Sequence, residues 1–214
     1  MIIRDLSQTL FEGMPVYPGD PPYESAPSLT FAVDGVNTRR LSFGSHVGTH
    51  VDAPRHFVAE GESVDAVSLD RFCGPAFLVD VPCIPGEPLR IPPESLAEIR
   101  TGDILILRTG WEREVGTMRY FTDCPRFAAE VPAQLLSRGI KALALDLPTV
   151  KSVGPSREMH HLLLGGGCVI VEGLVKLAAI VNRRVFFSAA PLKIAGGDGS
   201  PARAFVVDEP GLWN

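Results

Sequence analysis

The sequence predicts an α/β domain dominated by a β-sheet, because strand-like runs outnumber helix-like ones. Short runs rich in Val, Ile, Leu and Phe recur along the chain, and several are apolar throughout, as expected of strands buried on both faces. They cover residues 76–81, 103–109, 142–147, 168–174, 185–190 and 203–207.

Two segments between these runs have the composition of short helices, residues 92–100 and 131–139. The second has Pro132 in its first turn and Gly139 as a stop signal. The proline-rich segment 14–24 is too polar and too broken for a core strand, and we expect an ordered surface loop or lid. Its Tyr17 is a candidate for reaching a pocket, although a tyrosine in a loop is more often plain surface.

Length, charge and cysteine usage narrow the class of protein. The 214 residues are most simply one domain, residues 1–214. The net charge is −5 and the basic residues are scattered, which argues against a nucleic-acid partner. No secretory signal and no apolar run of membrane length is found, so we expect no membrane association. The four cysteines form no CxxC, and a cytoplasmic location is expected.

The most informative feature is the position of the histidines. All five fall in two groups, and each group has a carboxylate close by in sequence. Imidazole nitrogen and carboxylate oxygen suit zinc, manganese or iron, whereas chance clustering on a solvated surface is the competing explanation. The first group contains His46, His50, Asp52 and His56, and the second contains His160, His161 and, after an apolar run, Glu172.

Residues 41–52 alternate like a strand, and the alternation places His46, His50 and Asp52 on one side. Residues four apart on a straight strand are about 13 Å apart, which is at the limit for two imidazoles that share one ion. A bend at Gly48 would bring them together. A helix here is disfavoured by Gly44, Gly48 and Pro54.

The segment SHVGTHVDAPRHF resembles the HxGTHxDxPxHF signature of the cyclase family, whose best known members are the bacterial kynurenine formamidases, or arylformamidases. Further similar segments are VYPGDPP, LALDLPTV, MHHLLLGGGCVIVEGL and PLKIAGGDGSPARAFVV, so the resemblance spans most of the chain. It implies a swivelling β/β/α fold with a mixed sheet and a few helices. It also implies hydrolysis of an amide with one or two divalent cations, zinc or manganese.

The resemblance also assigns roles to individual residues. His56 corresponds to the acid-base residue of the family, and His161 is expected to support the site or to pack beside it. Two divalent cations would be held by five residues: His46, His50 and Asp52 for the first, His160 for the second, with Asp52 and Glu172 bridging.

Two departures from the kynurenine formamidases bear on substrate. Those enzymes typically have Trp where this chain has Tyr17, and an acidic residue where it has Lys151. Tyr17 can still stack on an aryl ring, so it is the expected substrate-binding residue.

Three functional hypotheses follow. The first is a metal-dependent amidohydrolase that cleaves N-formylkynurenine or a related aryl formamide. The second is a hydrolase that opens a cyclic amide or imide such as isatin. The third, a catalytically silent metal- or ligand-binding protein, is weakened by His56, for which such a module has no need. The resemblance further implies a homodimer or homotetramer.

Overall fold

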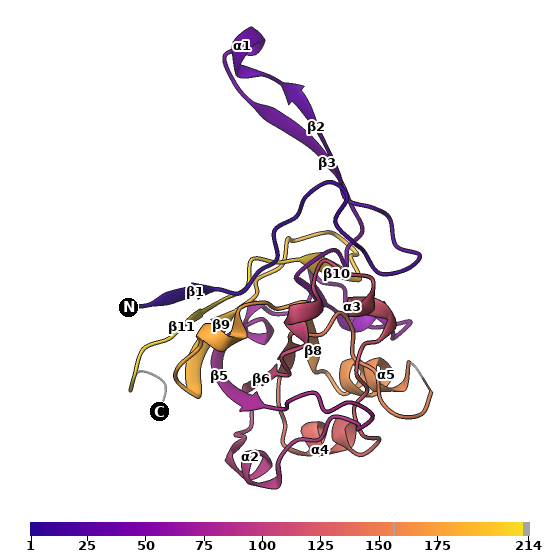
Figure 1. Ribbon diagram of the computed structural model, residues 1–214, viewed down its shortest axis with the longest axis vertical. Coiled ribbons are helices and arrows are strands. Elements are labelled where there is room, and N and C mark those ends of the chain that lie inside the picture. The colour runs from indigo at the N-terminus through magenta and orange to yellow at the C-terminus, as the bar shows by residue number, and fades with distance from the viewer. Residues whose placement is uncertain (156, 212–214) are drawn as a thin grey trace.

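Nine strands form one mixed, strongly curled sheet in the computed structural model, which describes residues 1–155 and 157–211 (Figure 1). Its centre consists of four parallel strands, each from one of the predicted apolar runs. These are β5 (Cys73–Asp80), β6 (Ile104–Arg108), β7 (Ala142–Leu145) and β8 (Val169–Glu172).

Antiparallel strands extend this centre on both sides, in the order β1-β11-β9-β5-β6-β7-β8-β4-β10. The two remaining predicted runs become β9 and β11. The flanking strands are β1 (Ile3–Asp5), β4 (His50–Asp52), β9 (Arg184–Ser188), β10 (Gly199–Pro201) and β11 (Phe205–Val207).

The expectation of a bent strand over residues 41–52 is wrong for most of that range. Residues 41–42 end another strand, β3 (Thr38–Ser42), and residues 50–52 form β4, but residues 43–49 between them are irregular chain, turns and bends. Gly48 has φ of 63°, so the chain does change direction at the predicted glycine. Strand β4 is only three residues long: it begins with His50, opposite Glu172 at the end of β8, and its other partner, β10, also pairs with three residues.

Few helices accompany the sheet, as predicted. Both predicted helices are present, α2 (Pro93–Glu98) and α4 (Val131–Ser137), with Pro132 in the first turn of α4. The structure adds α1 (Phe31–Asp34), α3 (Arg119–Thr122) and α5 (Glu158–Gly165), together with the short 3-10 turns η1 (Pro54–His56), η2 (Leu69–Arg71), η3 (Trp111–Glu114) and η4 (Leu177–Ala179). No helix in the described ranges is both long and apolar enough to cross a bilayer.

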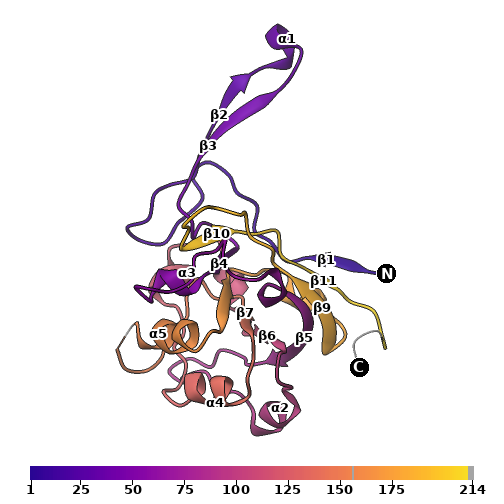
Figure 2. The ribbon, with the colours of Figure 1, turned by 180° about the vertical axis from the view of Figure 1, so that it is seen from behind.

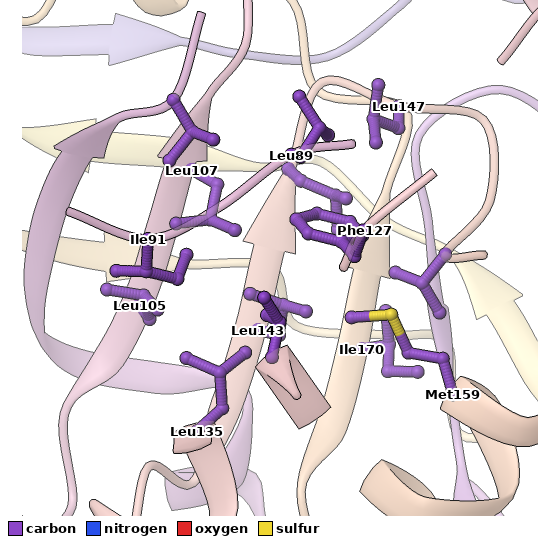
Figure 3. Packing of buried hydrophobic residues seen from close by; sticks show 14 of the residues in the cluster. Leu89, Ile91, Leu105, Leu107, Phe127, Leu135, Leu143, Leu147, Met159 and Ile170 are labelled. Carbon is purple, nitrogen blue, oxygen red and sulfur yellow. The ribbon is translucent and has the colours of Figure 1, made fainter. Parts of the chain in front are cut away.

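Alternate residues of the central strands fill two separate cores. Leu105 and Leu107 of β6 belong to the core shown in Figure 3, which α4 and α5 cover with residues such as Leu135 and Met159. Ile104 and Ile106 point into the other core. That second core also takes Val51 from β4, Phe187 from β9 and Val206 from β11, so strands from both flanks of the sheet curl around it.

A two-stranded hairpin projects from this body. Strands β2 (Glu24–Leu29) and β3 (Thr38–Ser42) pair with each other and not with the main sheet, and α1 caps the tip (Figures 1 and 2). The predicted loop 14–24 leads into this hairpin through a turn closed by the Asp20 N–H and the Tyr17 carbonyl oxygen, 3.0 Å apart.

The buried Asp208 fastens the edge of the sheet. Its carboxylate accepts hydrogen bonds from Arg4 Nε at 2.6 Å, from the N–H groups of Val181 and Asn182, and from the Asn182 amide. Burial raises the pKa of Asp208, but these donors outweigh it and lower the pKa to about 2. The ionised form is therefore the one that stabilises the fold.

We predict that Asp208→Asn lowers the free energy of unfolding by ~2 kcal/mol at pH 7, because it removes a charge that four donors stabilise. A lowered pKa gives stability that is present above the unfolded value near 3.8 and is lost as the pH falls towards about 2. Urea unfolding should thus show the difference from wild type shrinking between pH 7 and about pH 2.5. Glu60→Gln on the surface is the control, and a difference independent of pH contradicts the assignment.

Candidate metal centre and active site

Two paired strands, β4 and β8, carry three of the candidate metal ligands. In the antiparallel β4–β8 pair, His50 lies opposite Glu172 and Asp52 lies opposite Ile170. These side chains share the sheet face that carries the first core, whereas Val51 and its partner on β8 face the second core. His50 Nε2 is 3.4 Å from Glu172 Oε2 and 3.5 Å from Asp52 Oδ1.

Helix α5 supplies the fourth member of this group. His160 Nε2 lies 3.5 Å from Glu172 Oε1 and 3.8 Å from Asp52 Oδ2. The imidazole is 5% exposed, while Asp52 and Glu172 are 1% and 3% exposed. Two imidazoles thus face two carboxylates in a region that water hardly reaches.

His46 and His56 lie beside this group on the more open side. His46 Nδ1 is 2.9 Å from Asp52 Oδ1, and its Nε2 is 2.9 Å from Asp198 Oδ2. The His56 ring stacks on His46 with centroids 3.9 Å apart, and His56 Nδ1 is 3.5 Å from the same oxygen of Asp198. All six side chains predicted as metal ligands or acid-base residue are therefore brought together.

Backbone groups fix the orientation of two candidate ligands. His50 Nδ1 is 3.1 Å from the Gly48 carbonyl oxygen, so Nδ1 carries the hydrogen and Nε2 presents its lone pair to the carboxylates. Glu172 Oε1 accepts the Val150 N–H at 2.9 Å. Both side chains are thus oriented by contacts outside the cluster, as is usual for residues that hold a metal.

A close approach of two glycines brings the strands' ends together. Gly173, which follows β8, has φ of 73°, and a Cβ added to it would overlap the carbonyl group of Gly48. The Gly173 carbonyl oxygen accepts hydrogen bonds from Thr49 Oγ1 at 2.7 Å and from Gln8 Nε2 at 2.9 Å. These bonds tie the histidine-bearing loop to the strand that carries Glu172.

The donor set fits a metal ion. Among the described residues Asp52 Oδ2 is buried without a hydrogen-bond partner, an arrangement that costs free energy unless another group compensates for it. His160 Nδ1 is buried and unpartnered there too, but Nε2 is the nitrogen of this ring that faces the carboxylates. The imidazole-to-carboxylate distances involving His50 and His160 are 3.4–3.8 Å. Donors that share a tetrahedral ion at roughly 2.0–2.1 Å lie about 3.3–3.4 Å apart, so these spacings suit a shared cation better than direct hydrogen bonds.

Histidine protonation differs across the cluster. Burial alone lowers the pKa of His46, but hydrogen bonds to Asp52 and Asp198 outweigh it and raise the pKa to about 9. Burial lowers the pKa of His56, which favours its neutral form at physiological pH. A neutral imidazole that is still partly open to solvent can accept a proton.

The cluster lines part of a cavity of about 420 Å³. Another part of the lining is aromatic and basic: Tyr17 meets Phe121 edge to face with centroids 6.0 Å apart, and Lys151 Nζ lies 5.4 Å from the centre of the Tyr17 ring. The structure therefore places Tyr17 in the same cavity as the histidines. His161 is exposed and contacts the Phe57 ring at 5.3 Å, outside the cavity lining.

Sequence inspection misses several residues of the site. Asp198, which contacts His46 and His56, lies in the glycine-rich GGDGSP segment, where a single carboxylate between glycines is the signal that could have found it. Gln8, Phe121 and Arg157 line the cavity, but nothing in their local sequence distinguishes them from surface or core residues.

Comparison with known proteins decides the family. The family model described as "Putative cyclase" matches residues 4–152, more than half of the chain. A kynurenine formamidase from Bacillus mycoides (strain KBAB4) is 31% identical over 207 residues, which cover 94% of this chain and 95% of that protein. The chain belongs to the cyclase family. A kynurenine formamidase from Erythrobacter litoralis (strain HTCC2594) is 32% identical over 212 residues, covering 97% of this chain and 94% of that protein.

Solved structures confirm the fold class of this cyclase-family chain. The structure of a predicted metal-dependent hydrolase from Bacillus stearothermophilus is 28% identical with a TM-score of 0.79, covering 97% of this chain and 98% of that one. Isatin hydrolase A from Labrenzia aggregata, bound to benzyl benzoate, is 26% identical with a TM-score of 0.81, covering 97% and 94%. These similarities, with the clustered donors, support a metal cofactor.

We predict that Gly173→Ala destabilises the protein by at least ~2 kcal/mol more than Gly13→Ala, because overlap with Gly48 adds to the backbone strain. Gly13 has a similar φ of 81° and open space around it, so it controls for strain alone. Thermal unfolding and zinc titration should show a less stable protein with weaker zinc binding. Equal stability and zinc affinity in the two variants would rule out this contact as a requirement of the site.

Proposed function

We propose that the chain is a metal-dependent amidohydrolase of the arylformamidase type, which hydrolyses N-formylkynurenine or a related aryl formamide. One observation carries the proposal: a buried group of imidazoles and carboxylates opens into a cavity with an aromatic wall. Such a cavity suits a flat aryl amide whose reacting carbonyl lies at the cluster. The kynurenine formamidases that the chain resembles support the choice.

We propose two divalent cations, zinc or manganese. His46, His50 and Asp52 would hold one, and His160 the other, with Asp52 and Glu172 shared between them. When bound, such cations supply Lewis acidity to the amide carbonyl and make water more acidic. The donor set leaves room for substrate because few protein ligands serve each ion.

His56 is proposed as the acid-base residue. Its Nδ1 faces Asp198 Oδ2, which favours hydrogen on Nδ1 and leaves Nε2 to exchange the proton. Nε2 would accept a proton from the attacking water and deliver it to the departing amine nitrogen. The side chain is 27% exposed, so it can meet a substrate in the cavity.

Ring opening of a cyclic amide is the second candidate, favoured by the similarity to isatin hydrolase A. The same residues would serve, since an amide C–N bond is cleaved in both reactions. A catalytically silent metal-binding protein accounts less well for a His56 that lines the cavity without a clear need for it in metal binding.

We predict that the zinc- or manganese-loaded protein cleaves formanilides faster than unstrained alkyl formamides, because an arylamine is the better leaving group and the ring contacts Tyr17. Release of formate and arylamine, followed by chromatography, measures kcat/KM for each substrate. Isatin and a cyclic imide belong in the same panel. A much higher kcat/KM for either of them reverses the order of the two candidates, and no turnover of any amide rejects both.

We predict that the histidines separate by role. His56→Ala should retain two cations per chain but lose on the order of 10²–10⁴ in kcat, the range for a positioned acid-base group. His46→Ala and His160→Ala should each lose metal in elemental analysis, and His161→Ala is the matched control on the adjacent position. Equal metal loss in the His56 and His46 variants would show that His56 is a ligand.

We propose a homodimer or homotetramer, supported by the hairpin. A two-stranded hairpin is at best marginally stable alone, yet β2 and β3 lie outside the main sheet and expose apolar residues. Phe31 is 69% and Val33 is 83% exposed at its tip. A second copy of the chain is the simplest cover for such a surface.

We predict that F31D/V33D lowers the mass measured by light scattering to that of the monomer, because two charges at the tip oppose its burial. Ile84→Asp, which changes an exposed apolar residue away from the hairpin, should leave the mass unchanged. A monomeric wild type, or an unchanged mass of the double variant, would contradict the hairpin contact.

A cytoplasmic location is also proposed. Its support is chemical: Cys73, Cys83, Cys124 and Cys168 are all free thiols in the structure.

A further inference from the structure

Two cationic side chains face the cavity from the segment that follows β7. Lys151 is half-buried and Arg157 is exposed at the beginning of α5. No ion pair between the residues described in 1–155 and 157–211 involves either of them. Their charges are thus not neutralised by a carboxylate in direct contact, and the ammonium of Lys151 lies against the Tyr17 ring.

The position of Lys151 relative to the cluster is fixed by its backbone. The preceding N–H, of Val150, donates to Glu172 Oε1 at 2.9 Å. The Lys151 carbonyl oxygen accepts the Phe127 N–H at 2.6 Å. Because these two contacts hold the backbone at Val150 and Lys151, the Lys151 side chain extends from a fixed point near Glu172.

Charge on the cavity lining outside the buried cluster is mainly positive. Of the carboxylates that line it, Glu172 belongs to the buried cluster, and Asp20 is exposed on the turn that carries Tyr17. Outside the cluster, the lining therefore carries two cationic side chains and one exposed carboxylate. Uncompensated positive charge beside an aromatic wall favours an aryl group that bears an anion.

We propose that the substrate's arylamine part carries a carboxylate and no cationic group. Lys151, assisted by Arg157, binds this carboxylate, while Tyr17 and Phe121 contact the ring. The proposal rests on the amide hydrolysis proposed above. Water adds across the amide C–N bond, formate and the arylamine leave, and the carboxylate is unchanged, so Lys151 determines specificity and not the chemical step.

Three aryl formamides with one common reacting group test this. They are 4-(2-formamidophenyl)-4-oxobutanoate, its 2-amino derivative N-formylkynurenine, and the uncharged ketone that has methyl in place of the carboxylate. We expect kcat/KM for the first to exceed that of the uncharged ketone about 10-fold to 100-fold, the value of a hydrogen bond to a charged group. We also expect the first to exceed N-formylkynurenine, whose ammonium meets Lys151 and Arg157.

Variants of Lys151 should change these ratios. In Lys151→Met the ratio of kcat/KM for the carboxylate substrate to kcat/KM for the uncharged ketone should fall towards one. In Lys151→Glu, N-formylkynurenine should become a better substrate than 4-(2-formamidophenyl)-4-oxobutanoate. Because both substrates are measured with the same variant, a general loss of folded or metal-loaded protein does not change the ratio of their kcat/KM values. Lys193→Met, an exposed lysine outside the cavity, is the matched control and should keep the wild-type ratios. Unchanged ratios in Lys151→Met would overturn the proposal.

A binding measurement separates this proposal from the proposed function. 4-Oxo-4-phenylbutanoate has the ring and the carboxylate but no amide, so calorimetry with metal-stripped protein measures recognition without turnover. We expect binding that weakens about 10-fold or more in Lys151→Met and not in Lys193→Met. If no amide is hydrolysed but 4-oxo-4-phenylbutanoate still binds as expected, the proposed hydrolase activity is rejected and the role of Lys151 in binding is kept. Binding that is equal in the two variants overturns the role of Lys151.

Discussion

The antiparallel pairing of β4 with β8 is the constraint on which the site depends. It sets His50 opposite Glu172, and alternation then places Asp52 on the same face while Val51 anchors the strand in the second core. The approach of Gly48 to Gly173 sets how closely the loop and strand meet. A register shift of one residue would turn the ligands into the apolar core and Val51 into the cavity.

Burial of this much charge explains why the cluster needs a cation. Asp52 is held in its ionised form, with its pKa below the usual range, because hydrogen bonding to His46 outweighs the effect of burial. Asp52 Oδ2 is buried and has no donor among the described residues, which would weaken an ordinary fold. This arrangement is tolerable where a metal neutralises the charge, so the cost in the ion-free protein becomes binding free energy.

The parts predictable from sequence are those with a local cause. The central strands could be found because strands buried on both faces read as continuous apolar runs. Strand β4 could not be delimited, since its three residues are strand only through pairing with β8 and β10, which lie far away in the sequence. The hairpin was missed because its exposed residues show no alternation. The histidine set was found because a family motif surrounds it, whereas Asp198 reaches the site only through the curl that brings β10 beside β4.

Chemistry and specificity come from different parts of the chain. The cluster is built on β4, β8 and α5, whose positions are fixed by two apolar cores. Another part of the lining comes from the 17–20 turn and the segment after β7, which carry the half-buried Tyr17 and Lys151. Leu147 and Val150 anchor the second of these segments in the first core. Substitution of Tyr17 or Lys151 would change the charge and shape of the lining and leave this anchor in place. A fold shared with kynurenine formamidases and isatin hydrolase A is therefore compatible with different substrates, because side chains of the lining can change while the two cores stay the same.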